Sequence, residues 1–245
     1  MWKKILFGIT IVLCIVAGVY WFTYMKEIKT PVSSGINAIP LDAAFIFESK
    51  QSLTTWNKLS ASDMWHELIG TNAGTKLNLQ IGFMDSLLKS SPAFSQLLFN
   101  QSLFISAHTS GINSFNFLFV YSLPNLSYHS TLTDFIKTVD NKPIFVRTYD
   151  EAELYSIQDK NKNVFYYSFL RGTLMMSTSQ LLVEDAIRQL KSGLSFSMDR
   201  NFKNVIYTAG KNVDGNLYLN YKKLPKLLNH FIISTLQEET ADLSS

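Results

Sequence analysis

The chain has 245 residues, enough for one large domain or two small ones with a sizeable core. Its 47% hydrophobic, 13% aromatic and 17% charged residues exclude a disordered chain. The net charge of +3 is too small for the electrostatic footprint of a nucleic-acid-binding protein, and a single cysteine excludes an intramolecular disulfide.

Residues 5–25, ILFGITIVLCIVAGVYWFTYM, form an apolar run without a charge. At about 1.5 Å rise per residue, a helix of this length reaches roughly 31 Å, enough to cross a hydrocarbon core of about 30 Å. Lys3 and Lys4 precede the run, and aromatic side chains crowd its far end, as at a membrane interface. The pattern predicts a single transmembrane anchor within residues 1–28 that contacts membrane lipid through residues 5–25.

A cleaved signal peptide is the main alternative to this anchor. Its apolar core is typically about 7–15 residues long and ends in an A-x-A-like site, whereas Ala17-Gly18-Val19 leads here into large aromatic residues. The slight excess of lysine before the run favours an amino terminus in the cytoplasm. We therefore expect a single-pass protein of the bacterial inner (cytoplasmic) membrane, with its remaining residues in the periplasm or outside.

The residues after the anchor predict a short linker and then a domain. Residues 29–38 contain TPVSSGINA, which is punctuated by Ser, Gly and Pro and lacks periodicity. The domain is expected over residues 39–212 and opens with a strand at Leu41–Glu48. Alternation in this strand places the following side chains on one face: Leu41, Ala43, Phe45 and Phe47.

Helical periodicity follows this first strand. Helices are expected to begin at Ser52, to run from Ser60 to a stop at Gly70, to cover Leu77–Lys89, and to begin again with Pro92 in a first turn. A further helix is expected over Leu132–Val139. Another opens with a capping box between Ser177 and Gln180 and ends at Gly193.

The middle of the chain shows the two-residue period of strands. Six strands are expected, at Leu103–His108, Phe115–Ser122, Ile144–Tyr149, Glu153–Gln158, Val164–Leu170 and Thr173–Ser177. Helices on both sides of consecutive hairpins indicate an α+β fold, with a mainly antiparallel sheet packed with helices. Strands that alternate cleanly need helical cover on one face of the sheet only.

The last part of the chain repeats an earlier order of elements. A short helix at Phe202–Tyr207 precedes a strand at Asn216–Tyr221 and a helix at Lys222–Ile233. Ala43–Trp56 and Asn216–Leu228 both run from a strand through a polar joint into an amphipathic helix. We therefore predict that residues 213–245 are the start of a second, truncated repeat.

Several of these segments together resemble a known family. The run from Gly172 to Leu228 contains TSQLLVEDAIRQLKSG, LSFSMDRNFKNV and NLYLNYKKLPKLL, and IPLDAAFIFES opens the domain. With the membrane helix, this order resembles a bacterial family of membrane-anchored extracytoplasmic domains of unknown function. The resemblance implies an α+β domain outside the cytoplasm, and it implies no catalytic residue.

The sequence offers one dense group of titratable residues, Asp63, His66 and Glu67. On a helix these positions share a face, so a carboxylate there can orient the imidazole for base or ligand work. The alternative is an ordinary solvated helix face. His108 is expected to be a packed or surface histidine, and no base is identifiable for Ser106 beside it. No cofactor fingerprint is present, and the scattered histidines predict no metal site.

Aromatic residues form a stripe on the expected strand at Phe115–Ser122. Phe115, Phe117 and Phe119 share a face, which is typical of core packing and, where exposed, of a platform for glycan binding. The hypothesis that these patterns favour is a non-catalytic, membrane-anchored envelope domain that binds a protein partner or an envelope component. The alternatives are an envelope hydrolase that uses Asp63, His66 and Glu67, and a glycan-binding module that uses the aromatic stripe.

Overall fold

The computed structural model describes residues 13–19, 34–90, 92–99, 101–110, 114–123, 144–158, 162–210 and 213–228. The chain divides into two units, Met1–Val32 and Ser33–Ser245. In the first unit, residues 13–19 are helical and their apolar side chains are exposed. Most of the expected anchor lies outside the described residues. No helix among the residues that were described is both long and apolar enough to cross a membrane.

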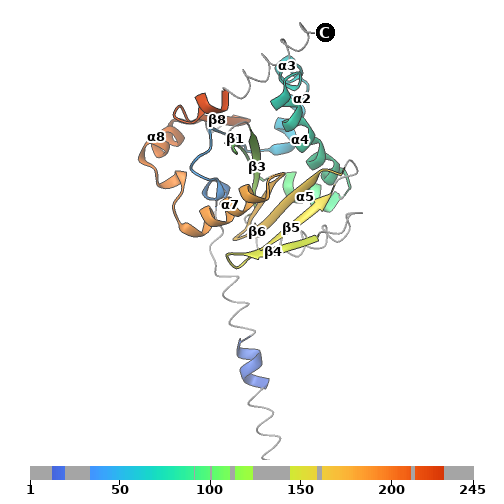
Figure 1. The fold of residues 1–245 in the computed structure, drawn as a ribbon, viewed down its shortest axis with the longest axis vertical. Helices are drawn as coiled ribbons and strands as arrows, with labels where there is room; N and C mark the ends of the chain where they lie inside the picture. Colours follow the sequence, from blue (N-terminus) through green and yellow to red (C-terminus); the bar gives the residue numbers. More distant parts are fainter. Residues whose placement is uncertain are drawn as a thin grey trace, which may run out of the picture. The chain divides into compact units, whose positions relative to one another are not determined.

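The second unit is built on one antiparallel sheet of eight strands in the order β4-β5-β6-β7-β3-β2-β1-β8 (Figure 1). Every neighbouring pair is antiparallel. The strands are β1 (Phe45–Ser49), β2 (Leu103–Thr109), β3 (Phe115–Ser122), β4 (Ile144–Tyr149), β5 (Ala152–Gln158), β6 (Val164–Leu170), β7 (Thr173–Ser177) and β8 (Gly215–Leu219). The α+β class and the hairpin and meander strands predicted from the sequence are confirmed.

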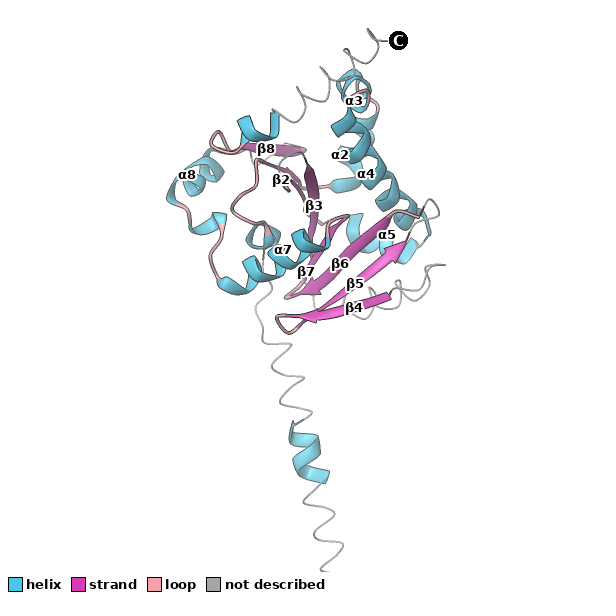
Figure 2. Cartoon of the chain, in the orientation of Figure 1, coloured by secondary structure: helices cyan, strands magenta, loops and turns pink. Residues whose placement is uncertain are grey.

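Helices pack on both faces of this sheet (Figure 2). One face carries α2 (Ser52–Ser60), α3 (Asp63–Ile69), α4 (Asn72–Ser90) and α5 (Pro92–Phe99). The other carries the 3-10 helix η1 (Gly35–Ala38) and α7 (Gln180–Ser192), with η2 (Phe196–Met198) and α8 (Arg200–Thr208) beside them. A short helix at residues 224–228 follows β8.

Cover on both faces corrects the expectation of a sheet covered on one face. In β3, the aromatic side chains at odd positions enter the core under α3–α5, while Leu118 and Val120 enter the core under α7. All of these residues are at most 8% exposed. The odd and the even positions of β3 are therefore both apolar, as in a strand that is buried on both faces.

The first strand is shorter than predicted, because the chain turns before it. Ala43 N donates a hydrogen bond to Pro40 O at 3.2 Å, and β1 begins only at Phe45. Ala43 consequently packs in the core under α7, Phe45 packs against the opposite core, and Leu41 is 44% exposed. The single apolar face predicted for these residues is wrong.

The expected linker is also shorter, because η1 belongs to the folded unit. Ile36, Ala38 and Ile39 are at most 7% exposed in the core under α7. Gly35 N donates to Ser122 Oγ at 2.7 Å. The segment from Ser34 onward is therefore part of the domain rather than a tether.

Several predicted helix starts differ from those of the structure, and α4 begins at Asn72 rather than at Leu77. Ser179, not Ser177, caps α7 by accepting from Leu182 N, because Ser177 Oγ donates to Phe117 O at 2.7 Å and accepts from Ser179 N. The helix ends at Gly193 as expected, where φ is +73°. The helix expected over Leu132–Val139 lies outside the described residues, and the helix expected from Lys222 is described at residues 224–228 only.

The segments with similar sequence patterns lie side by side. β8 is the neighbour of β1 in the sheet, with Phe45 opposite Leu219 and Ser49 opposite Gly215. Each strand is followed by a helix, α2 in one case and residues 224–228 in the other. The truncated repeat at 213–245 remains a prediction, and its first strand, β8, is the edge strand next to β1 in the same sheet.

Candidate functional site

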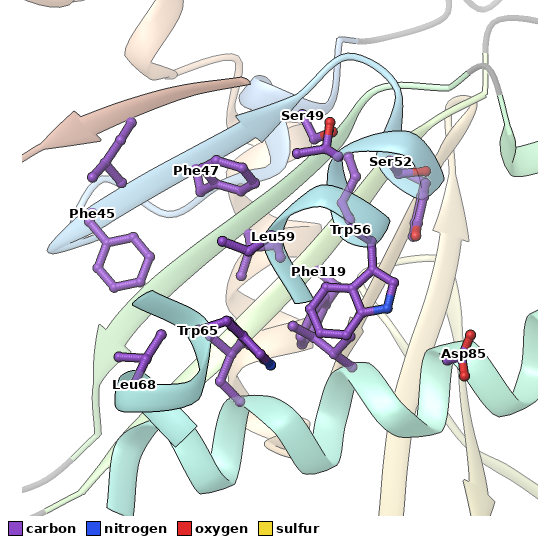
Figure 3. A pocket seen from close by; sticks show the side chains of 17 residues that line it. Phe45, Phe47, Ser49, Ser52, Trp56, Leu59, Trp65, Leu68, Asp85 and Phe119 are labelled. Carbon is purple, nitrogen blue, oxygen red and sulfur yellow. The ribbon is translucent and has the colours of Figure 1, made fainter. Parts of the chain in front are cut away.

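A cavity of about 300 Å³ lies between the sheet and helices α2–α4 (Figure 3). Aromatic and aliphatic side chains make up most of its wall. The lining residues are Phe45, Phe47, Ser49, Ser52, Thr55, Trp56, Leu59, Trp65, Leu68, Leu77, Ile81, Asp85, Leu103, Ile105, Phe119, Tyr121 and Leu217. Among these described residues only Asp85 carries a charge.

Local sequence places two tryptophans on the helical side of the cavity. Ser62 begins α3 by accepting a hydrogen bond from Trp65 N at 3.2 Å, and this start turns Trp65 toward the sheet. Its ring meets Trp56 of α2 edge to face, with 4.9 Å between centroids and 87° between planes. Edge-to-face packing is a favoured aromatic geometry. The pair therefore forms a defined part of the wall.

A glycine lets α4 approach the end of α3. A Cβ atom added at Gly74 would lie 1.8 Å from Leu68 O, which is a backbone atom. Thr71 accepts from Gly74 N at 3.0 Å and donates to Leu68 O at 2.7 Å. The two helices are therefore joined tightly at this corner, and Leu77 and Ile81 of α4 reach the cavity from there.

The polar side chains at one end of the cavity hydrogen-bond within the protein. Ser49 Oγ donates to Thr55 Oγ1 at 2.9 Å, and Thr55 Oγ1 donates to Asp214 O at 3.1 Å. Ser52 Oγ donates to Leu98 O at 3.4 Å. Burial raises the pKa of the Tyr121 hydroxyl, and a hydrogen bond with Ser52 opposes that shift. The cavity thus offers an apolar wall whose few hydroxyl groups already have partners.

The residues proposed from the sequence for hydrolysis lie elsewhere. Asp63, His66 and Glu67 are exposed on α3, and none of them lines the cavity. Within the described part of the chain, no group of three or more His, Cys, Asp or Glu could hold a metal ion. The cavity therefore lends no support to the hydrolase alternative at these residues.

The residues proposed for glycan binding are in the core. Phe115, Phe117 and Phe119 are 8%, 2% and 2% exposed. Phe115 and Phe117 meet edge to face at 5.6 Å, and Phe119 forms part of the cavity wall. A stacking platform needs exposed rings. These three rings are instead packing partners of α3–α5.

Sequence reasoning missed a hydrogen-bonded chain of Ser106, His108 and Asp42. Ser106 Oγ is 2.8 Å from His108 Nε2, and His108 Nδ1 is 2.8 Å from Asp42 Oδ1. This order matches the Ser-His-Asp arrangement of hydrolytic enzymes. Residues 106 and 108 share a strand face because they are two apart, so their contact could be predicted. The turn that brings Asp42 to them has no such signal.

Burial distinguishes this hydrogen-bonded arrangement of Ser106, His108 and Asp42 from a catalytic triad. Ser106 is 0% exposed and His108 is 2% exposed, and neither lines the cavity. A serine nucleophile must reach the substrate carbon, so a hydroxyl enclosed in the sheet cannot act as one in this conformation. The arrangement instead satisfies three polar groups on the α7 side of the sheet.

No family model matches the chain, and no curated protein or solved structure shows significant similarity to it. The family resemblance described from the sequence remains an expectation. The candidate function is therefore argued from the geometry of the cavity.

Proposed function

We propose that this protein is a non-catalytic, membrane-anchored domain of the bacterial envelope that holds an apolar envelope component, the acyl chain of a lipid, in the cavity under α2–α4. The observation that carries the proposal is the wall of that cavity, which is aromatic and aliphatic apart from hydroxyls that already have partners and Asp85. A site with these properties favours a ligand without hydrogen-bonding groups in its buried part.

The size of the cavity supports a chain-like ligand. An engineered apolar cavity of about 150 Å³ stays dry and binds benzene. The cavity here is about twice that volume, at about 300 Å³, and is at the lower end of the range for ligand pockets. It therefore accommodates a segment of an acyl chain, with a polar headgroup outside.

Tryptophan fluorescence offers a direct test. In a background in which Trp2 and Trp21 are replaced by phenylalanine, Trp56 and Trp65 are the remaining emitters, and both line the cavity. Titration with a brominated fatty acid is expected to quench their emission in a saturable manner. Fatty acid without bromine is expected to compete with the brominated fatty acid for the cavity. Lipid that is extracted from the purified protein identifies the native occupant.

A cavity-filling variant separates binding from folding. Ile81→Phe adds volume inside the cavity and is expected to reduce the quenching at least tenfold while the unfolding midpoint stays the same or rises. Leu181→Phe is the matched control, because Leu181 is 69% exposed on α7 and should leave quenching unchanged. Unchanged quenching in Ile81→Phe, or no saturable quenching in the parent protein, would refute the proposal.

A further inference from the structure

A second concave surface lies on the opposite side of the sheet, between α8, η2 and the edge strand β8. We call it the α8 groove; its volume is about 610 Å³. Its floor includes Ile46 and Tyr218 of the sheet, and α8 contributes Phe202 and Val205. Unlike the first cavity it has a polar rim, formed by Ser195, Asp199, Asn201, Asn220 and Lys222.

The helix that forms this groove is amphipathic, and none of its residues is buried. Phe202, Val205, Ile206 and Ala209 recur at helical spacing on one side. Phe202 packs against Phe196 and Tyr218, with ring centroids 5.0 Å and 5.3 Å apart. Val205 and Ile206 nevertheless remain 48% and 40% exposed. The apolar side of α8 is therefore only half covered by the domain itself.

Basic side chains lie on the elements that form the groove, and one of them, Lys222, lines it. Lys203 on α8 and Lys222 and Lys223 on the turn after β8 are exposed. The acidic residue on the rim, Asp199, accepts a hydrogen bond from Phe202 N at 2.9 Å and caps α8. A half-covered apolar side flanked by lysines is the composition of helices that lie at the interface of an anionic membrane.

The chain enters this unit next to the groove. Ser197 Oγ in η2 donates to Asn37 Oδ1 at 2.8 Å, and Asn37 is three residues after Ser34. If the anchor ends at residue 25, the nine residues up to Ser34 span at most about 30 Å. A short connection of this kind raises the effective concentration of the groove at the bilayer surface.

We propose that the α8 groove docks on the surface of an anionic bilayer, as a second membrane contact beside the anchor. The proposal rests on the membrane anchor of the proposed function and is independent of the ligand in the first cavity. Lys203, Lys222 and Lys223 contact lipid phosphates, and Val205 and Ile206 enter the region between headgroups and acyl chains. The partner is recognised by its charge and its apolar interior, not by a specific headgroup.

The test uses the full chain in lipid nanodiscs and a dye that senses polarity. In a Cys14→Ser background, Val205→Cys carries the dye on the groove. Thr148→Cys carries it on β4, at the opposite edge of the sheet. Discs that contain one third phosphatidylglycerol are expected to shift the emission of the Val205 label to shorter wavelength. The Thr148 label should not shift, and neither label should shift in phosphatidylcholine discs.

Charge variants test the basic rim. The double change Lys222→Glu and Lys223→Glu is expected to lower the affinity of the groove for anionic discs by about thirtyfold or more, since each of the two basic residues near the surface contributes about 1 kcal/mol. Lys76→Glu is the control, because Lys76 is exposed on α4 on the other side of the sheet. An unshifted Val205 label in anionic discs, or an equal shift in neutral discs, would overturn the proposal. So would a shift that occurs only when a protein extract is added.

The anchor is assessed separately by extraction with carbonate. If carbonate washes the protein off the membrane, the anchor is refuted. The soluble protein is then mixed with vesicles that have the lipid compositions of the anionic and the phosphatidylcholine discs. A shift of the Val205 label in anionic vesicles would still support the groove. Its absence would refute both membrane contacts.

Discussion

His108 Nδ1 lies 2.8 Å from Asp42 Oδ1, so a histidine side chain that is 3% exposed joins strand β2 to the turn before β1. A carboxylate can only accept, so the imidazole donates through Nδ1, and in the neutral ring Nε2 then accepts from the hydroxyl of Ser106. The tautomer of this buried ring is thereby set by two partners. The turn before β1 is thereby held to β2, an inner strand of the sheet.

The contact between His108 and Asp42 should make the free energy of unfolding depend on pH. The hydrogen bond from His108 is the main cause that lowers the pKa of Asp42 from its ordinary value of 3.8. A lowered pKa in the folded state stabilises the fold fully above the unfolded-state pKa, and this contribution declines below about 3.8 and is lost as the pH falls through the lower folded-state pKa. Asp42→Asn should therefore lower the free energy of unfolding at pH 7 and have a smaller effect at pH 3.

Urea unfolding at the two pH values measures this difference. Glu67→Gln is the control, because Glu67 is an exposed carboxylate on α3. An effect of Asp42→Asn that is as large at pH 3 as at pH 7 would contradict the assignment.

We expect the buried Ser106 to stabilise the fold rather than to act as a nucleophile. Ser106→Ala removes the donor to His108 Nε2 and leaves a buried acceptor, at an expected cost of about 1–3 kcal/mol. The folded protein should not react with a fluorophosphonate probe, since the hydroxyl is 0% exposed. Labelling is followed by mass spectrometry in the parent chain and in Ser106→Ala. Probe attached to Ser106 under native conditions would reopen the hydrolase hypothesis.

The close approach at Gly74 should be intolerant of any side chain. In Gly74→Ala the new methyl group meets the backbone of Leu68, which has no free rotamer to yield, so α3 and α4 must separate. We expect a loss of about 1–3 kcal/mol in the free energy of unfolding and weaker quenching of Trp56 and Trp65 by brominated fatty acid. Gly82→Ala is the control, because open space surrounds that position. Equal stability of the two variants would refute the argument.

An ion pair between β4 and α7 should contribute more to the free energy of unfolding than an ion pair between two exposed side chains. Glu184 Oε1 accepts from Arg147 Nε at 3.1 Å and from Gln180 Nε2 at 2.8 Å, and the Glu184 side chain is 5% exposed. Arg147→Met leaves this buried carboxylate with one donor fewer. We expect a loss of about 1–3 kcal/mol, reduced from the full value for buried pairs because Arg147 is 47% exposed.

The control for this prediction is Arg188→Met on α7. Arg188 pairs with Asp185, and both side chains are about half exposed, so the loss should stay below about 1 kcal/mol. Chemical denaturation of both variants gives the comparison. A larger effect at Arg188 than at Arg147 would contradict it.

Local patterns predicted most elements of the domain. The strands from Leu103 to Ser177 are found within a few residues of their expected bounds, because alternation and turn residues are properties of neighbouring positions. The start of β1 was missed, since the turn at Pro40–Ala43 depends on the packing of η1. The cap of α7 was misplaced by two residues, because Ser177 is drawn to the carbonyl of Phe117 in another strand.

The candidate sites depend on contacts over longer distances. Trp56 and Trp65 carry clear helical periodicity, but nothing in the sequence indicates that they leave a cavity against Phe119 rather than fill it. The apolar stripe on α8 is visible in the sequence, whereas its partial exposure depends on how β8 pairs with β1. The dense group Asp63, His66 and Glu67 shows the reverse case, where a suggestive sequence pattern lies on an ordinary exposed helix.

Strand β1 separates the α2–α4 cavity from the α8 groove, and Phe45 is among the residues that line both. The Phe45 ring itself packs on the α2–α4 side against Phe117, so an occupant that shifts the backbone of β1 on one side reshapes the other side as well. Thermodynamic reciprocity then requires that lipid contact at the groove alter the affinity of the cavity for its ligand by the same factor as the bound ligand alters the affinity of the groove for lipid. Strand β1 is thus a physical route by which the two faces of this sheet can sense one another.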